Sequence, residues 1–109
     1  MIITDGEIHD MKDTVDLIVH ASGLPMSVII IGVGNEKFKM MKKLDADKSA
    51  LEDRNGNRAK RDCVQFVKFK KFRNRPINEL AEKVLEEMPS QIVTYMTQNG
   101  ITPQRKQYP

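Results

Sequence analysis

The spacing of hydrophobic positions changes several times along the chain, and the uninterrupted apolar runs predict three strands. These runs occupy residues 1–3, 26–33 and 63–67, and glycine follows the first two. Apolar runs of this length are typical of strands rather than helices. The 26–33 run is nearly continuous and rich in β-branched residues, as expected for a central strand that helices cover on both faces.

Between the strands, apolar residues recur at helical spacing. A first helix is predicted after Asp10, which can act as its N-cap, and Gly23 is predicted to end it. A short second helix is predicted to follow Asn35 as its cap. Its apolar residues are expected to face the core: Phe38, Met41 and Leu44.

The C-terminal part predicts one interrupted helix and a tail. Pro76 is expected to open the helix, and Pro89 to break or kink it, because proline lacks the amide hydrogen for the next helical bond. Ser90 is predicted to cap the second piece, and Gly100 to end it. Residues 102–109 are predicted to form a flexible tail.

The polar segment 45–62 is predicted to be a solvated loop. Its Asn55-Gly56 pair is a turn signal that favours a small hairpin. The acidic run at 45–49 resembles a calcium loop only superficially, because Ala50 stands where such a loop needs glycine and Gly56 where it needs glutamate. The sequence therefore predicts no calcium site there.

This order of elements, β-α-β-α-loop-β-α, predicts an α/β fold: a three-stranded parallel sheet with flanking helices and right-handed crossovers. In open α/β sheets, ligands bind at the carboxyl ends of the strands. Asp5 directly follows the first predicted strand, so its carboxylate is expected where binding or chemistry would take place.

Composition narrows the class of protein. The 109 residues suffice for one domain at most, and 18 basic against 15 acidic side chains give a net charge of +3. That excess is too small by itself to argue for nucleic acid. A single cysteine fits a reducing compartment, and no apolar run approaches the roughly 20 residues that cross a bilayer. No secretory signal is visible either, so a soluble intracellular protein is expected.

Catalysis has a weak candidate in Asp5, His9 and Asp10, which lie close in sequence and can be drawn as an acid–base cluster. However, the sequence has no nucleophile elbow, phosphate loop or zinc-type histidine pair. Cys63 has no histidine nearby in sequence and fits a structural thiol better than a nucleophile. The chain is therefore predicted not to be an enzyme, and catalysis by Asp5 and His9 is the least favoured alternative.

The basic segment 58–75 suggests another function. Its second half interleaves two phenylalanines with cations: Lys68, Phe69, Lys70, Lys71, Phe72, Arg73 and Arg75. Such a pattern can stack on bases and neutralise phosphates, which makes binding of nucleic acid or of an anionic membrane surface the main alternative. We favour the interpretation that the phenylalanines anchor the connection while the charges are solvated.

Several segments together resemble a known family. The IITDG run at 2–6 resembles the third metal-site segment of von Willebrand factor A-type domains. The longer pattern, formed by residues 2–11, 24–34, 61–67 and 80–101, resembles the A-type domain at the C-terminus of copines. This resemblance covers nearly the whole chain in order, and it corresponds to about the second half of that domain.

The resemblance implies a non-catalytic protein-interaction module with intracellular protein partners, which the full domain captures at the carboxyl ends of its strands. By their match to the motif, Thr4, Asp5, Gly6 and Glu7 are the expected partner-binding residues. Copines bind phospholipid in a calcium-dependent way through C2 domains, which these residues do not include. Cytoplasmic localisation with recruitment to the plasma membrane is therefore implied for the family. Lys68 stands where copines often have proline, and it adds positive charge.

The metal-ion-dependent adhesion site implied by the resemblance is incomplete. Asp5 matches one aspartate of that site and carries over its role alone. The Asp-x-Ser-x-Ser loop and the threonine of an earlier loop have no counterpart in this sequence. Because a magnesium-type cation prefers octahedral oxygen ligands, no cofactor is expected for the chain alone. Mg²⁺ or Mn²⁺ is expected only where missing segments or another chain complete the site.

The resemblance also predicts an open edge. In a doubly wound, Rossmann-like A-type domain, the three strands would be the fourth, fifth and sixth, and the first strand would lie beside the fourth. Residues 1–4 would then form an unpaired edge flanked by apolar helix faces, which predicts self-association. Residues 1–101 are expected to form the partial domain.

Overall fold

Three parallel strands form the centre of the structure, which is a computed structural model describing residues 1–35, 37–45 and 50–104. The strands are β1 (Ile2–Thr4), β2 (Val28–Gly32) and β3 (Val64–Lys68), and their order in the sheet is β1-β2-β3. In the observed register, Ile30 of β2 lies beside Ile2 of β1 and Phe66 of β3. The predicted α/β fold with a central second strand is therefore confirmed.

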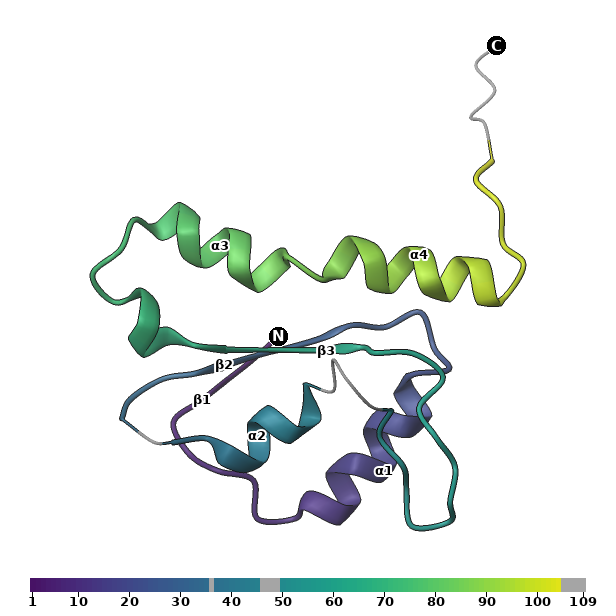
Figure 1. The fold of residues 1–109 in the computed structure, drawn as a ribbon, viewed down its shortest axis with the longest axis horizontal. Helices are drawn as coiled ribbons and strands as arrows, with labels where there is room; N and C mark the ends of the chain where they lie inside the picture. The colour runs from purple at the N-terminus through teal and green to yellow at the C-terminus, as the bar shows by residue number, and fades with distance from the viewer. Residues whose placement is uncertain (36, 46–49, 105–109) are drawn as a thin grey trace.

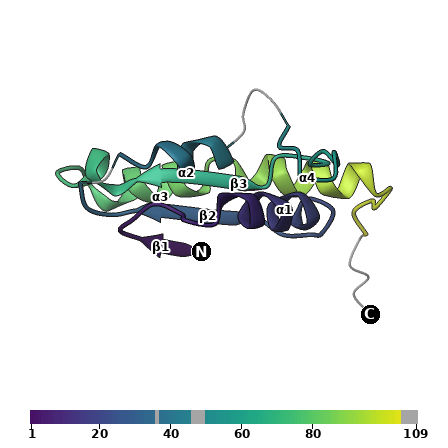
Figure 2. The same ribbon diagram turned by 90° about the horizontal axis from the view of Figure 1, so that it is seen from below.

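Helices cover both faces of the sheet, and each face carries different elements (Figures 1 and 2). The helices α1 (Met11–Ala21) and α2 (Lys39–Leu44) lie on one face. The other face carries the 3-10 turn η1 (Phe69–Phe72) and α3 (Ile77–Leu85), and α4 (Met88–Gln98) continues along the same side. Crossovers of one hand that step across a sheet in one direction place their helices on the same face, which accounts for the position of α1 and α2.

Each face of the sheet has its own hydrophobic core. Ile30 packs with Phe38, Met41 and Leu44 on the face covered by α1 and α2. Its neighbours in β2, Ile29 and Ile31, pack instead with Val67 and Val84 beneath α3. Because successive strand residues point to opposite faces, a strand that is covered twice must be apolar at every position.

The start of α2 differs from the prediction. Phe38, rather than Asn35, occupies its N-cap position, with a left-handed φ of 52°. The Phe38 ring is buried against Gly32 and Phe66, where an added Cβ on Gly32 would come within 2.9 Å of that ring. Asn35 was therefore wrong as the cap, since burial of the ring fixes the turn that precedes the helix.

The predicted interruption of the last helix is confirmed, but it lies before Pro89. Glu87 is the N-cap of α4, and Pro89 occupies the first turn, where its missing amide leaves no helical bond unmade. Ser90 is therefore not the cap; its hydroxyl donates to the carbonyl of Glu87 at 3.0 Å. Gly100, at a φ of 66°, follows the end of α4, as expected. Of the predicted tail, residues 105–109 lie outside the described residues.

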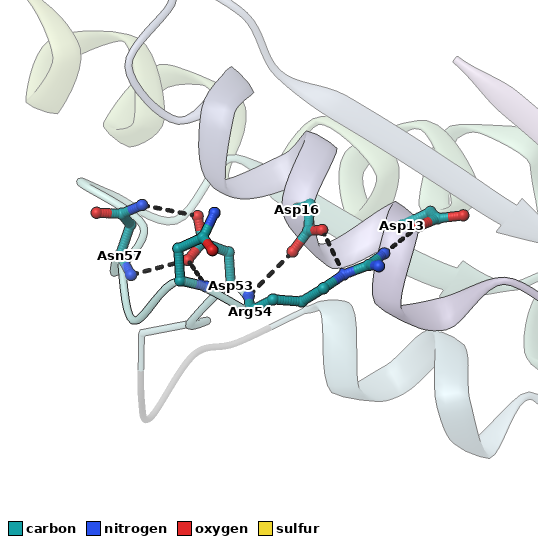
Figure 3. A network of polar contacts seen from close by, with 6 residues as sticks. Asp13, Asp16, Asp53, Arg54 and Asn57 are labelled. Atoms are coloured by element: carbon teal, nitrogen blue, oxygen red, sulfur yellow. Dashed lines mark hydrogen bonds and ion pairs between the residues drawn. The ribbon is translucent and has the colours of Figure 1, made fainter.

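The predicted small hairpin is present, with an antiparallel bridge between Glu52 and Arg58 and a left-handed Gly56 at its turn. Asp53 stabilises the turn by accepting bonds from the amides of Asn55 and Asn57 at 2.9 and 2.8 Å (Figure 3). Desolvation raises the pKa of Asp53, but the bonds from Asn57 and Asn55 hold that pKa below its ordinary value. Residues 46–49 of the rejected calcium loop lie outside the described residues.

Arg54 attaches this hairpin to α1 through exposed ion pairs with Asp13 and Asp16 (Figure 3). Replacing Arg54 with alanine is expected to lower the free energy of unfolding only slightly, because exposed pairs are well screened. Urea unfolding at low and high salt would measure this loss, which should shrink as salt rises. Arg73→Ala is the control, because no ion pair of Arg73 occurs among the described residues. A loss for Arg54→Ala that is equal at low and high salt would contradict a screened contact.

Candidate functional site

The carboxyl end of β1 presents the carboxylate that the sequence singled out. β1 ends at Thr4, whose carbonyl accepts from the amide of Val33 at 2.8 Å, and the next residue, Asp5, is exposed. The Thr4 hydroxyl donates to the carbonyl of Gly6 at 3.2 Å, which closes a tight turn around Asp5. The turn therefore holds Asp5 at the carboxyl end of the sheet.

Glu7 lies in the same loop but has a different role. It is half-buried, and its Oε2 accepts from the amide of Met40 at 3.0 Å, in the first turn of α2. Its other oxygen, Oε1, is buried and has no hydrogen-bond partner among the described residues. Glu7 thus fastens the Asp5 loop to α2, a contact between residues far apart in sequence that no local pattern could indicate.

An apolar groove of about 700 Å³ lies beside β1 and α1. Its lining includes Ile2 of β1, Leu17 of α1 and Met26, all of which are exposed. His9 and Asp10 stand at the groove, whereas Asp5 is not among the residues that line it. Among the described residues, no side-chain hydrogen bond or ion pair joins Asp5 to His9, as an acid–base pair would require.

The two edges of the sheet differ in how their backbone groups are covered. At the outer edge of β3, Asp62 Oδ1 accepts from the amide of Val64 at 3.1 Å and Asp45 Oδ2 accepts from that of Phe66 at 3.0 Å. At the β1 edge, Ile2 and Ile3 are 52% and 67% exposed, and no side-chain hydrogen bond reaches either within the described part of the chain. One edge is thus protected, and the other is open.

Asp45 and Asp62 were not identified as a pair from the sequence. Together with Glu87 they place carboxylate oxygens within 4.8 Å of one another, although they come from the end of α2, the start of β3 and the start of α4. Only the tertiary fold brings these segments together. The observed bonds to Val64 and Phe66 identify the role of the two aspartates in closing the β3 edge.

The basic segment does not form one continuous surface. Arg61 is buried, and its Nη2 donates to the carbonyls of Leu24 and Met26, each at 2.6 Å. Arg75 forms an ion pair with Glu79 at 3.2 Å. The remaining cations of the predicted set stand at and beyond the end of β3: Lys68, Lys70, Lys71 and Arg73.

The aromatic residues of this segment anchor it to the core. Phe69 and Phe72 are half-buried and pack against the cluster beneath α3. Desolvation, together with repulsion from Lys42, Lys71 and Lys70, lowers the pKa of Lys68. The phenylalanines are therefore occupied in packing, while the lysines concentrate positive charge at one place.

Cys63 has the environment of a structural thiol. It is 2% exposed, and its Sγ lies 3.9 Å from the carbonyl of Ile18. Burial raises the pKa of the thiol, although the charge of Arg61 opposes that shift. A raised pKa keeps the thiol protonated at neutral pH, whereas a nucleophile needs the thiolate.

Fold and site together define an α/β protein whose parallel sheet has an exposed carboxylate at its carboxyl end and one open edge. Three helices pack on the sheet from both faces, as in one half of a doubly wound domain. No helix among the described residues is long and apolar enough to span a membrane.

Comparison with known proteins identifies the family. The family model described as Copine matches residues 1–104. Over 103 residues, or 94% of this chain, the sequence is 50% identical to Copine-C and 52% identical to Copine-A of Dictyostelium discoideum. Copine-E of the same organism is 49% identical over 107 residues, or 97% of this chain. The chain belongs to the copine family, and it spans 17–19% of the length of these three relatives.

Proposed function

We propose that this chain is a non-catalytic protein-interaction module that captures an intracellular protein at the β1 side of its sheet. The observation that supports this most directly is the contrast between a carboxylate-protected β3 edge and an open β1 edge beside an apolar groove. Sheets usually protect their exposed edges, and an open edge is a template for pairing with another polypeptide. No hydrogen bond or ion pair between Asp5 and His9 is found among the described residues, which supports a non-catalytic role.

In this proposal, the loop from Thr4 to Glu7 forms the charged rim of the binding surface. Asp5 supplies an exposed negative charge, while Thr4 and Gly6 fix the turn that presents it. Glu7 anchors the loop through the amide of Met40. A partner with a basic group next to an extended apolar segment would complement both the loop and the neighbouring groove.

The residues present do not by themselves fit a magnesium site. Such an ion prefers octahedral oxygen coordination and usually one or two carboxylates with several waters. Asp5 is the exposed carboxylate of this loop, Glu7 is held by Met40, and the Thr4 hydroxyl is held by Gly6. Coordination of Mg²⁺ or Mn²⁺ at Asp5 would need ligands from other segments or another chain.

In this proposal, membrane association is a property of other parts of a longer copine protein. The resemblance to copines implies calcium-dependent phospholipid binding through C2 domains, and the present residues span less than a fifth of the relatives compared. The interaction module would then be carried to the plasma membrane by other parts of such a protein, and would recruit its partner there from the cytoplasm.

An open apolar edge predicts that the purified chain associates with itself. Light scattering is expected to give a mass of at least twice the 12.5 kDa of one chain. Ile3→Lys should shift this mass to that of the monomer, because a charged side chain on an edge strand opposes pairing. Ile77→Lys is a matched control, since Ile77 is 77% exposed but lies on α3.

Repeating the measurement with millimolar magnesium tests completion of the Asp5 site by another chain. A mass that rises with magnesium in the native chain, and not in Asp5→Asn, would support a shared site. A monomer that ignores magnesium would contradict both edge pairing and a metal contributed at Asp5. If Ile77→Lys dissociated the assembly as well as Ile3→Lys does, the contact would not be centred on β1.

A further inference from the structure

A second candidate binding surface lies on the opposite side of the sheet from the β1 edge. An open pocket of about 280 Å³ follows the outer edge of β3, between α2 on one face and α3 on the other. Lysines from four elements line it: Lys42 of α2, Lys68 at the end of β3, Lys71 of η1, and Lys83 of α3. The tertiary fold thus brings these lysines together from separate segments, rather than from one run of basic residues in the sequence.

Among the described residues that line this pocket, lysines outnumber carboxylates by four to one. Lys83 forms an ion pair with Glu86 at 2.8 Å. Across the described residues, no ion pair involves Lys42, Lys68 or Lys71. Asp45 is the one carboxylate among the described residues that line the pocket, and its Oδ2 accepts from the amide of Phe66. The hydrogen bond to Glu86 raises the pKa of Lys83, and the negative charge of Asp45 contributes to that rise.

The lysines lie close enough to oppose one another. Desolvation lowers the pKa of Lys68, and repulsion from Lys42, Lys71 and Lys70 lowers it further. Phe69 and Phe72 pack against the core and hold the η1 turn that carries Lys70 and Lys71. The charges are therefore kept together by the packing of apolar side chains, and a bound anion would relieve their repulsion.

We propose that this pocket binds a phosphate monoester, with Lys42, Lys68 and Lys71 donating hydrogen bonds to its oxygens. A lysine ammonium is a compact point charge with three donors, and several around one pocket can neutralise a doubly charged phosphate. Phe69 and Phe72 are half-buried against the core, and of these two rings Phe72 alone lines the pocket, which favours a phosphate group over successive stacked bases. A phosphorylated inositol carries this chemistry, either free or as a lipid headgroup.

Calorimetric titration of the full 109-residue chain with inositol trisphosphate at physiological salt is the first test. Lys42→Gln and Lys68→Gln are each expected to weaken binding about tenfold, as loss of a charged hydrogen bond implies. Lys43→Gln removes the same charge from the neighbouring position of α2 but outside the pocket, and it should change binding less than about twofold. NMR spectra of the backbone amides would verify that each variant remains folded.

Vesicles distinguish the two sources of the phosphate. Binding to phosphatidylcholine vesicles that contain phosphatidylinositol bisphosphate would identify a lipid headgroup, and binding of the free trisphosphate alone would identify a soluble ligand. The proposal is overturned if neither probe binds, or if Lys43→Gln weakens binding as much as Lys42→Gln. It is also overturned if phosphatidylserine vesicles or an oligonucleotide of equal charge bind equally well. Asp5→Asn should leave phosphate binding unchanged, which separates this site from the proposed protein-binding surface.

Discussion

Phe38→Ala is expected to lower the free energy of unfolding by about 3–5 kcal/mol, the usual loss when a buried phenylalanine is truncated. Phe38 is 1% exposed, and its ring centroid lies 5.6 Å from that of Phe66. Removing the ring would leave a cavity between the sheet and α2, beside Gly32, whose missing side chain makes room for it. Small domains have only about 5–15 kcal/mol of stability, so this variant should be close to unfolding.

Phe38→Leu is the matched control for this change. Both variants retain a Cβ, so the cost of the left-handed backbone at a φ of 52° is the same in each. Leucine refills part of the cavity and should be less destabilising than alanine. Urea unfolding monitored by circular dichroism would measure both losses. A loss below about 1 kcal/mol for alanine would show that the ring is not central to the core.

Arg61→Met is expected to cost about 3 kcal/mol, because it removes two charged hydrogen bonds, to the carbonyls of Leu24 and Met26. The Leu24 carbonyl keeps a second donor, the amide of Met26 at 2.8 Å. The Arg61 guanidinium also lies 5.4 Å from the centre of the Tyr95 ring in α4. One buried cation thus connects the segment before β2, the start of β3 and α4. Methionine keeps much of the side-chain length, so the effect should come from the lost polar contacts rather than from a large cavity.

Arg58→Met is the control, because Arg58 is an exposed cation of the same basic segment. It should change stability by no more than about 0.5 kcal/mol, as is usual for surface positions. Tyr95→Leu combined with Arg61→Met would complete a double-mutant cycle, and a coupling of about 1 kcal/mol is expected from the cation–π contact. Equal thermal midpoints for Arg61→Met and Arg58→Met would contradict the structural role of Arg61.

The structural roles of Phe38 and Arg61 could be predicted from the sequence to different extents. The helical spacing of Phe38, Met41 and Leu44 predicted their inward orientation, and all three are buried. The position of Phe38 before the helix, rather than within it, depends on the space above Gly32 in another element. Arg61 appeared in sequence as one of several cations in a basic run, and only the arrangement of Leu24 and Met26 around it explains its burial.

The order of strands and helices, the central position of β2 and the placement of Asp5 directly after β1 could all be predicted from the amino-acid sequence. Those features follow from local periodicity, because burial on one or both sides of an element imposes a repeating pattern on its residues. The same local logic located the hairpin at Asn55-Gly56 and the break near Pro89.

The contacts between polar groups, by contrast, depend on how the elements pack in three dimensions. The bonds from β3 to Asp45 and Asp62, the anchoring of Glu7 on α2 and the gathering of Lys42 with Lys68 all join separate segments. A polar side chain at the end of an element carries no periodic signal, since its partner is set by how the elements pack in space. For this reason the core of the protein could be predicted from its sequence, and the resemblance to copines predicted the open edge at residues 1–4, whereas the closed β3 edge and the lysine pocket could not be predicted.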